Sequence, residues 1–301
     1  MTKNTKSVKE TGFDKAFNYV IFFLAVIITL IVLYPIIYVV SASFSNPLEV
    51  SRGTVIFFPK SLTSMAYKTI LDRKDLIVGY KNTIMITFFG TVINLFMTIC
   101  CAYPLSRRNF AGKNVITMIV TFTMFFNAGM IPNYLLMKEL HLLNSYWVLM
   151  LPGAISVYNM LIMRNFFKTS IPDELFDSAI IDGCNNLQTL LKIVIPLSKG
   201  IIAVMVIFYA VGHWNSYFDA MMYLSKKAKY PLQLVLRNIL LETQTYISEG
   251  ASAGYNSAEA ALAYVSIQYA IIVVSSLPVL ILYPLMQKHF VKGIMIGAVK
   301  G

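Results

Sequence analysis

The chain has 301 residues, of which 57% are apolar and only 13% are charged. Soluble domains average about 45–50% apolar and about 25% charged residues, so this composition excludes an ordinary soluble domain. The formal net charge is nevertheless +11. An apolar, basic chain is typical of a membrane protein whose inner loops hold the cations, whereas nucleic-acid binding needs a polar basic surface that this chain lacks.

Six stretches contain no Asp, Glu, Lys or Arg, and each is long enough for a helix that crosses the hydrocarbon core. They are residues 16–48, 82–106, 114–137, 140–163, 200–218 and 260–287. The first could be a signal peptide, but its apolar core, residues 17–40, exceeds the about 7–15 residues of such a segment. The sequence therefore predicts an all-α membrane protein with six transmembrane helices spanning residues 17–287.

An even number of crossings places both termini on one side of the membrane. With both termini inside, 14 of the 25 Lys and Arg are inside, and a short turn at residues 107–113 holds three cations and no acid. The positive-inside rule thus favours an N-in, C-in topology. Residues 1–16 and 288–301 are then cytoplasmic ends, and residues 44–81 and 219–259 are long outer loops.

Three cysteines, Cys100, Cys101 and Cys184, lack the spacing of a metal site, so we expect free thiols and no metal. The chain also has no G-x-x-x-x-G-K-[ST] phosphate-binding loop, so it is not expected to bind ATP. The three histidines, His141, His213 and His289, lie in separate segments, without the cluster of His and acids or the nucleophile with its base that a membrane-embedded enzyme would require. The sequence predicts a non-catalytic protein without a cofactor of its own.

Residues 164–200 form the one inner loop with organised polar sequence. Ser170 is expected to cap a short helix with Asp173 as its capping-box partner, and an apolar stripe follows at helical spacing. Gly183 is expected to end that helix, because glycine adopts a left-handed turn at little cost. Asn185 and Gln188 can then start a second helix that leads to Pro196 and the fifth span. Periodicity alone leaves open whether the first helix docks into a partner or lies on the bilayer.

The stretch Asp177-Ser178-Ala179-Ile180-Ile181-Asp182-Gly183-Cys184, followed by Ile193-Val194-Ile195-Pro196-Leu197, resembles the EAA loop of permease subunits in binding-protein-dependent ABC importers. Ala179, Asp182, Gly183 and Pro196 match the family pattern, while Asp177 replaces its usual Glu. Two further stretches, 213–218 and 290–301, resemble permeases of carbohydrate importers of the maltose type. The resemblance runs from about residue 13 to the end of the chain.

The resemblance implies that the loop between spans 4 and 5 carries a cytoplasmic coupling helix that sits in a cleft of a separate ATPase. That ATPase would bind ATP and Mg and form a dimer. The residues that match this coupling role are Glu174, Asp177, Ala179, Asp182, Gly183 and Pro196. We expect Gly183 to matter because a side chain would obstruct the turn. The tail residues Gly297, Lys300 and Gly301 match a segment that reaches toward the ATPase.

A sugar pathway should be lined by polar or aromatic groups inside the spans, because such groups are costly when they face lipid. The candidates are Asn94, Asn127, Asn133, Tyr134, Asn159, His213, Trp214, Asn215 and Gln268. Each could instead hold helices together or anchor a span at the interface. Asn215 is the leading candidate because it matches the family's W-N motif.

The resemblance also implies partners: a second, related permease that completes a heterodimer, an extracytoplasmic solute-binding protein and a carbohydrate substrate. The implied branch handles oligosaccharides or polysaccharide fragments at a bacterial plasma membrane. The outer segment 223–259 opens with a possible amphipathic helix, residues 231–241, and in relatives the matching loop enters the binding protein. An ion-coupled secondary carrier or a permease for a non-sugar solute are the alternatives. Carriers usually have intramembrane acids, which all six windows lack.

Overall fold

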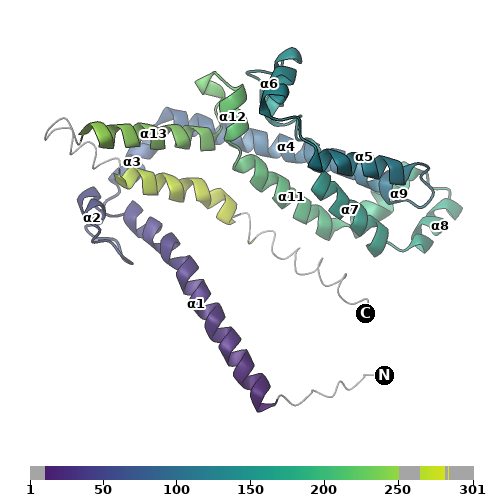
Figure 1. The fold of residues 1–301 in the computed structure, drawn as a ribbon, viewed down its shortest axis with the longest axis horizontal. Coiled ribbons are helices and arrows are strands. Elements are labelled where there is room, and N and C mark those ends of the chain that lie inside the picture. Colours follow the sequence, from purple (N-terminus) through teal and green to yellow (C-terminus); the bar gives the residue numbers. More distant parts are fainter. Residues whose placement is uncertain (1–10, 251–264, 282–283, 285–301) are drawn as a thin grey trace. The chain divides into compact units, whose positions relative to one another are not determined.

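The computed structural model describes residues 11–250, 265–281 and 284. All regular secondary structure in these residues is helical, which confirms the predicted fold class at this level (Figure 1). The chain divides into two compact units, one made of residues 1–70 and 242–274 and the other of residues 71–241 and 275–301. The predicted tail, 288–301, lies outside the described residues.

The first unit is built on one long apolar helix, α1 (Gly12–Ser43). Thr11 and Asp14 form a capping box that fixes its start, as the side chain of each accepts from the backbone N–H of the other. Its 32 residues span about 48 Å, more than the hydrocarbon core requires. Nearly all its side chains are exposed, as expected for a helix that faces lipid or a partner.

Two short helices, α2 (Pro47–Ser51) and α3 (Met65–Asp72), follow α1. A small core of Ala42, Val50 and Val55 packs against the beginning of a later helix, Val265–Ile281. That helix is also fastened by a hydrogen bond of 3.2 Å from the Ser266 hydroxyl to the carbonyl of Ser45. Residues more than 200 positions apart therefore close this unit.

The second unit is organised around α4 (Lys74–Ser106), α7 (Val157–Ser170) and α11 (Lys199–Trp214). The buried side of α4 is rich in small and polar residues, which let helices approach closely and hydrogen-bond across the interface. These residues include Gly79, Asn82, Thr83, Gly90, Thr91, Asn94 and Thr98. The opposite side of α4 exposes large apolar side chains.

Two of the six apolar windows do not form single straight helices. Window 114–137 divides into α5 (Lys113–Phe125) and α6 (Met130–Glu139), which are bent by 112° at a break closed by Gly129 with φ +92°. Window 140–163 contains turns and one 3₁₀ helix, η1 (Tyr146–Leu149), before α7 begins. The hydropathy of a window does not reveal such breaks, because the residues in them are free of charge and mostly apolar.

Proline and left-handed residues explain the second irregular window. His141 and Asn144 have positive φ values of 54° and 57°, and Pro152-Gly153 lies in the turn before α7. Proline removes a helical hydrogen bond and glycine adds backbone freedom, so Pro152-Gly153 prevents a continuous helix through this window. The structure has two helices long and apolar enough to span a membrane among the described residues, or up to four if each bent pair is one span. The count of six crossings stays a prediction.

The segment after α11 is held by hydrogen bonds to α4. It contains α12 (Phe218–Tyr223), η3 (Lys227–Lys229) and α13 (Leu232–Gly250). Asn82 donates to the carbonyls of Ala228 and Tyr230 at 2.9 and 3.0 Å. The hydroxyl of Thr83 accepts from the N–H of Leu232 at 2.7 Å. The expected helix at 231–241 is present and continues to residue 250.

Candidate functional site

A helix, α8 (Asp173–Ile181), lies at the position of the predicted coupling helix, but its start differs from the expectation. Ser170 is the last residue of α7, and Pro172 is the N-cap of α8 without a side-chain capping bond, so the expected Ser170–Asp173 capping box is wrong. The reason is that Ile171 is buried, which draws the chain into an extended link between the two helices. Asp173 and Glu174 occupy the first turn, where acids favour the helix dipole.

The end of α8 agrees with the prediction in place and in cause, but not in the expectation that a side chain at Gly183 would obstruct the turn. Gly183 adopts φ +73°, and the N–H groups of Gly183 and Cys184 donate to the carbonyls of Ile180 and Ala179 at 3.0 and 2.8 Å. This pattern is a Schellman motif, which satisfies the last carbonyls of the helix. A Cβ at Gly183 would meet nothing within 4 Å, so obstruction is not the reason for glycine here. The left-handed backbone conformation is the reason.

A second helix follows where the sequence predicts it. Asn185 and Gln188 form a full capping box at the start of α9 (Asn186–Thr189). A π-helical turn, η2 (Leu190–Val194), and a short turn, α10 (Ile195–Leu197), lead to Pro196 and then α11. The chain bends by 83° between residues 186–197 and α11. Pro196 cannot donate a helical hydrogen bond, which suits its position at this bend.

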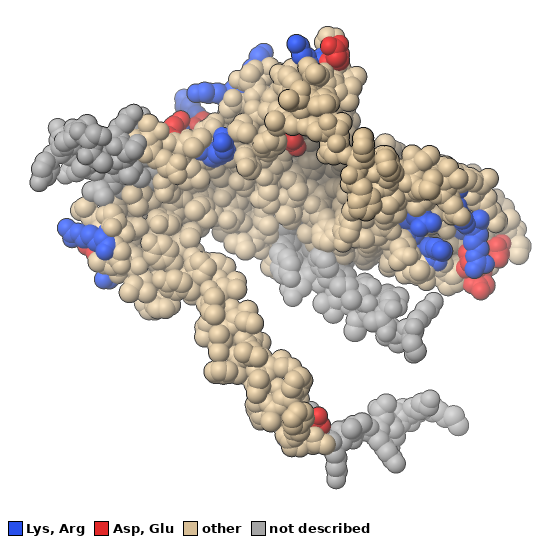
Figure 2. Space-filling view, in the orientation of Figure 1, with Lys and Arg blue, Asp and Glu red and all other residues tan. Residues whose placement is uncertain are grey.

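The candidate coupling residues are divided between an exposed and a buried side of the loop. Glu174, Asp177, Asp182 and Gly183 are exposed, and the three acids make no ion pair with any described residue, while Ala179 is buried. Ile181 is 85% exposed beside them. Figure 2 shows basic and acidic side chains close together at the end of this unit that carries α8 and α9. An exposed apolar group flanked by free carboxylates can dock into a basic, apolar cleft.

Two arginines from the 107–113 turn hold the other side of α8. The guanidinium carbon of Arg107 lies 3.4 Å from the centroid of the Phe176 ring, and Arg108 pairs with Asp173 at 2.8 Å. Arg164 on α7 also donates to the carbonyl of Leu105 at 2.9 Å, near the end of α4. Sequence reasoning missed these contacts, although the cluster of cations in so short a turn was a signal.

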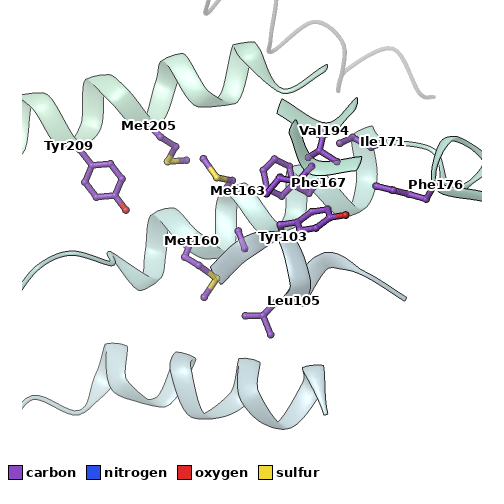
Figure 3. Close-up of a cluster of buried hydrophobic side chains, with 12 residues drawn as sticks. Tyr103, Leu105, Met160, Met163, Phe167, Ile171, Phe176, Val194, Met205 and Tyr209 are labelled. Carbon is purple, nitrogen blue, oxygen red and sulfur yellow. The ribbon is translucent and has the colours of Figure 1, made fainter. Parts of the chain in front are cut away.

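Phe176 is also part of a hydrophobic cluster that joins α8 to three longer helices. It is 5% exposed and shares the cluster with Tyr103 of α4, Phe167 of α7 and Met205 of α11. Figure 3 shows Tyr103, Phe167 and Val194 gathered at one end of the cluster, with Phe176 beside them. A displacement of α8 would therefore also displace α4, α7 and α11, because tightly packed interiors transmit strain.

A polar cavity of about 690 Å³ lies between α4, α6, α7, α11 and α12. Its volume suits a sugar-sized ligand. Four of the predicted pathway residues line it: Asn94, Asn133, Asn159 and His213. Phe208, Tyr209 and Tyr223 add aromatic surface, so the cavity combines amides with rings, as recognition of carbohydrates requires.

Asn94 organises the polar side of this cavity. Its side chain is 1% exposed, its amide nitrogen donates to the carbonyl of Gly153 at 2.6 Å, and its amide oxygen lies 2.6 Å from Nε2 of His213. Because an amide oxygen can only accept, His213 donates through Nε2. One asparagine thus links α4, the turn before α7 and α11.

Gly90 makes room for His213. A Cβ on Gly90 would lie 2.5 Å from Nε2 of His213, which is closer than side chains can approach. Thr98, one turn beyond Asn94 on α4, bonds to the hydroxyl of Tyr209 at 2.7 Å. The small and polar residues of α4 therefore set the positions of His213 and Tyr209 on α11.

The other five pathway candidates lie elsewhere. Asn127 is exposed in the break between α5 and α6 and accepts from the N–H of Gly129. Tyr134 stacks on Tyr223 with ring centroids 6.1 Å apart and packs in a separate cluster. Gln268 lies on the Val265–Ile281 helix, in the first unit.

Trp214 and Asn215 are close to the cavity in sequence but do not line it. Trp214 is buried, donates to the carbonyl of Ser275 at 3.2 Å and lines a separate apolar cavity of about 390 Å³. Asn215 caps the end of α11 and donates to the carbonyl of Val211 at 3.0 Å. Its amide oxygen also accepts from Gln233 at 3.5 Å. The structure favours a packing role for Trp214 and a helix-ending role for Asn215.

Sequence reasoning missed several polar residues that line the cavity, among them Ser156, Tyr209, Ser216 and Asp219. Tyr209 is four residues before His213 and therefore on the same face of α11, a spacing that could have found it. Asp219 lies beyond the predicted end of this span, and partial burial raises the pKa of its carboxyl above the usual range. The candidate tail residues Gly297, Lys300 and Gly301 lie outside the described residues.

Comparison with known proteins identifies the family. Residues 76–296 match the family described as binding-protein-dependent transport system inner membrane component. The chain is 42% identical over 272 residues to protein LplC of Bacillus subtilis, covering 90% of each chain. It is 39% identical over 288 residues to the polygalacturonan/rhamnogalacturonan transport system permease protein YtcP of the same species, covering 96% of this chain and 99% of that one.

A solved structure of an ABC transporter chain is also similar to this chain. A chain of a bacterial ABC transporter involved in the import of the acidic polysaccharide alginate matches with a TM-score of 0.83 and 36% identity. The match covers 94% of this chain and all of that chain. The fold, the coupling loop and these matches lead to one conclusion: the chain belongs to the family of binding-protein-dependent transport system inner membrane components.

Proposed function

We propose that this chain is a permease subunit of an ATP-driven ABC importer that moves oligosaccharides or polysaccharide fragments into the cell. A solute-binding protein would deliver the solute outside, and a separate ATPase would supply the energy inside. The observation that carries the proposal is α8, a nine-residue helix with exposed acids on one side and a buried anchor, Phe176, on the other.

The coupling role follows from how α8 is held. A docking helix must present free groups to its partner and be firmly attached to the part that moves. Asp177, Asp182 and Ile181 supply the free groups, while Phe176 and Asp173 supply the attachment. The ATPase dimer would bind ATP and Mg, and its closure would press on α8 and tilt α4, α7 and α11.

The substrate class is supported by the cavity and by the relatives. Amides at Asn133 and Asn159 can bond hydroxyl groups, Asn94 holds His213 in place, and Tyr209 can contact a sugar ring. One relative transports polygalacturonan and rhamnogalacturonan, and others arabinooligosaccharides and galactooligosaccharides, according to their names. This chain shares their length and family, so an oligosaccharide is the class of solute we propose.

The assembly we propose has six crossings, with both termini inside, and a second, related permease. One such chain encloses too little space for a whole pathway, so a heterodimer with that permease would complete it. The outer segment around α13 would meet the solute-binding protein. The tail residues Gly297, Lys300 and Gly301 would reach toward the ATPase. The coupling positions Glu174, Ala179, Gly183 and Pro196 would contact the ATPase or shape the loop that does.

Two alternatives make different predictions. An ion-coupled carrier would transport without an ATPase, and its activity would collapse when ionophores remove the ion gradient. A permease for a non-sugar solute would copurify with an ATPase but would not respond to an oligosaccharide-loaded binding protein. The exposed acids of α8 favour an ATP-driven importer over an ion-coupled carrier.

The deciding experiment is copurification followed by an ATPase assay. The chain is expressed with its genomic neighbours, reconstituted in lipid vesicles and mixed with the loaded binding protein. We expect an ATPase subunit to copurify and its activity to rise when the loaded binding protein is added. Absence of a copurifying ATPase would sink the proposal.

A matched pair of glycine variants tests the coupling loop. Gly183 and Gly53 have similar left-handed φ values, +73° and +68°, and a Cβ at either would meet nothing within 4 Å. Alanine at either position should cost about 1 kcal/mol of backbone strain. Only Gly183→Ala should lower the stimulated ATPase activity and uptake, because only Gly183 ends the coupling helix.

A further inference from the structure

A second cavity, of about 500 Å³, lies where the end of α4 meets α8 and α9. Its polar lining consists of Tyr103, Arg107, Asn109 and Asn186, and its apolar lining includes Cys100 and Leu190. We call it the α4-end cavity. It is distinct from the polar cavity described above, because the two share no lining residue.

The hydroxyl of Tyr103 points to a missing ligand. Tyr103 is 7% exposed, and its hydroxyl is buried without a hydrogen-bond partner among the described residues. A buried polar group without a partner is costly, so native structures usually provide one. Here the space beside the hydroxyl is a cavity rather than packed protein. An acceptor placed in the cavity would satisfy it.

Arg107 determines the charge of that acceptor. It directly follows the last residue of α4, and its side chain lines the same cavity as Tyr103. The face of its guanidinium lies over Phe176, and within the described part of the chain its N–H groups donate to no other group. A cation with free N–H groups beside a buried hydroxyl suits an oxyanion such as a phosphate.

The position along α4 indicates where the phosphate comes from. Residues 82–106 carry no charge, and cations begin at Arg107, Arg108 and Lys113. The cavity therefore lies at the depth where hydrocarbon gives way to lipid headgroups. Cys100, one turn before Pro104, is exposed and extends an apolar path from the cavity along the lipid-facing side of α4. An acyl chain can follow that path while the headgroup fills the polar end.

We propose that the α4-end cavity binds one anionic phospholipid. The phosphate accepts hydrogen bonds from Arg107 and Tyr103, the amides of Asn109 and Asn186 bind the remaining headgroup oxygens, and an acyl chain passes Cys100. Basic pockets between membrane helices are known to take such headgroups. The lipid would brace the end of α4 against the α8–α9 turn, whichever solute is transported.

Native mass spectrometry of the purified complex, or of the full chain where no complex forms, tests the proposal. Phosphatidylglycerol is titrated against phosphatidylcholine, and retained lipid is counted. Wild type should retain one phosphatidylglycerol in preference to phosphatidylcholine. Arg107→Gln should weaken this binding about tenfold, and Tyr103→Phe about threefold, because they remove a charged and a neutral hydrogen bond.

Two control variants isolate the cavity from general charge. Arg108→Gln removes the neighbouring cation, which does not line the cavity, and should change binding less than twofold. Tyr146→Phe removes a distant hydroxyl that already bonds Asn82 and should have no effect on lipid retention. Tyr103→Phe deletes only one oxygen and keeps the packed ring, so its effect reports on the lost hydrogen bond rather than on folding.

Three outcomes would overturn the proposal. The first is equal retention of phosphatidylglycerol by wild type, Arg107→Gln and Tyr103→Phe. The second is displacement of the lipid by an excess of inorganic phosphate, which would assign the cavity to a soluble phosphate compound. The third is unchanged lipid retention with loss of the ATPase subunit from both variants, which would assign the cavity to the ATPase interface.

Discussion

The coupling loop and the polar cavity use polar residues in opposite ways. On α8 the acids at Glu174, Asp177 and Asp182 are exposed and have no ion-pair partner among the described residues. In the cavity, Asn94 and His213 bond to each other across 119 positions of sequence. The first arrangement awaits another protein, whereas the second is already assembled within this chain. Exposed, unpaired acids suit the docking of another protein, whereas the buried Asn94–His213 bond shapes the polar cavity, which we call the chamber.

The two regions are connected through α4. Asn94 lines the chamber, and Arg107, thirteen residues later, caps the end of the helix over Phe176. That separation is about 20 Å along the helix axis. Because α4 is one continuous helix, a push on α8 can change the position of Asn94. The predictions below alter one region at a time and ask whether the other responds.

The largest effect should come from removing the anchor of α8. Phe176→Ala deletes a buried ring, which typically costs about 3–5 kcal/mol, and also loses the contact with Arg107. We expect a clearly lower melting temperature of the purified complex and loss of uptake. Ile181→Ala, on the same helix but 85% exposed, should leave the melting temperature unchanged and weaken ATPase binding. Equal melting temperatures for the two variants would refute the division of α8 into an anchor and a docking side.

The second largest effect should come from crowding the chamber without changing its polarity. Gly90→Ala places a methyl group against His213 and should cost about 1–3 kcal/mol through overpacking, breaking the bond to Asn94. Solute uptake should fall while the ATPase subunit still copurifies. Gly12→Ala, at the start of α1 with nothing within 4 Å and not in the cavity lining, is the control and should keep normal uptake. The interpretation fails if the two variants behave alike.

The smallest effect should come from the exposed ion pair that joins the 107–113 turn to α8. Arg108→Asp should lower coupling modestly, because exposed pairs contribute about 0–1 kcal/mol and like charge then faces Asp173. Combining it with Asp173→Arg restores the pair in reverse. Recovery of stimulated ATPase activity in the double variant would support a direct contact. A double variant no better than Arg108→Asp would show that the pair does not position α8.

The sequence predicted the coupling loop better than the chamber for a physical reason. The Gly183 stop and the Asn185–Gln188 box depend on neighbours three or four residues away, and both are confirmed. The Ser170 cap failed because burial of Ile171, a tertiary contact, overrode a local preference. Chamber residues depend on how helices meet, so the predicted set included Asn94 and His213 but also Asn215, which lies outside.

Apolar composition also conceals breaks in the helices. Window 140–163 has the composition of a membrane helix, yet the turn at Pro152-Gly153 supplies the carbonyl that Asn94 binds. Irregular backbone is tolerated inside a membrane protein where it lines a cavity and its polar groups are satisfied. A break in a span is therefore part of how the chamber is built, and hydropathy cannot report it.

The central claim is that ATP hydrolysis by a partner ATPase docked on α8 drives solute movement through the chamber. The most direct test measures uptake of a labelled oligosaccharide into vesicles that contain the whole complex, the loaded binding protein outside and ATP inside, with ionophores present. The account predicts that uptake needs ATP, persists with ionophores and is lost in Ile181→Glu, which puts a charge on the docking side of α8. Uptake that ignores ATP and collapses with ionophores would contradict it.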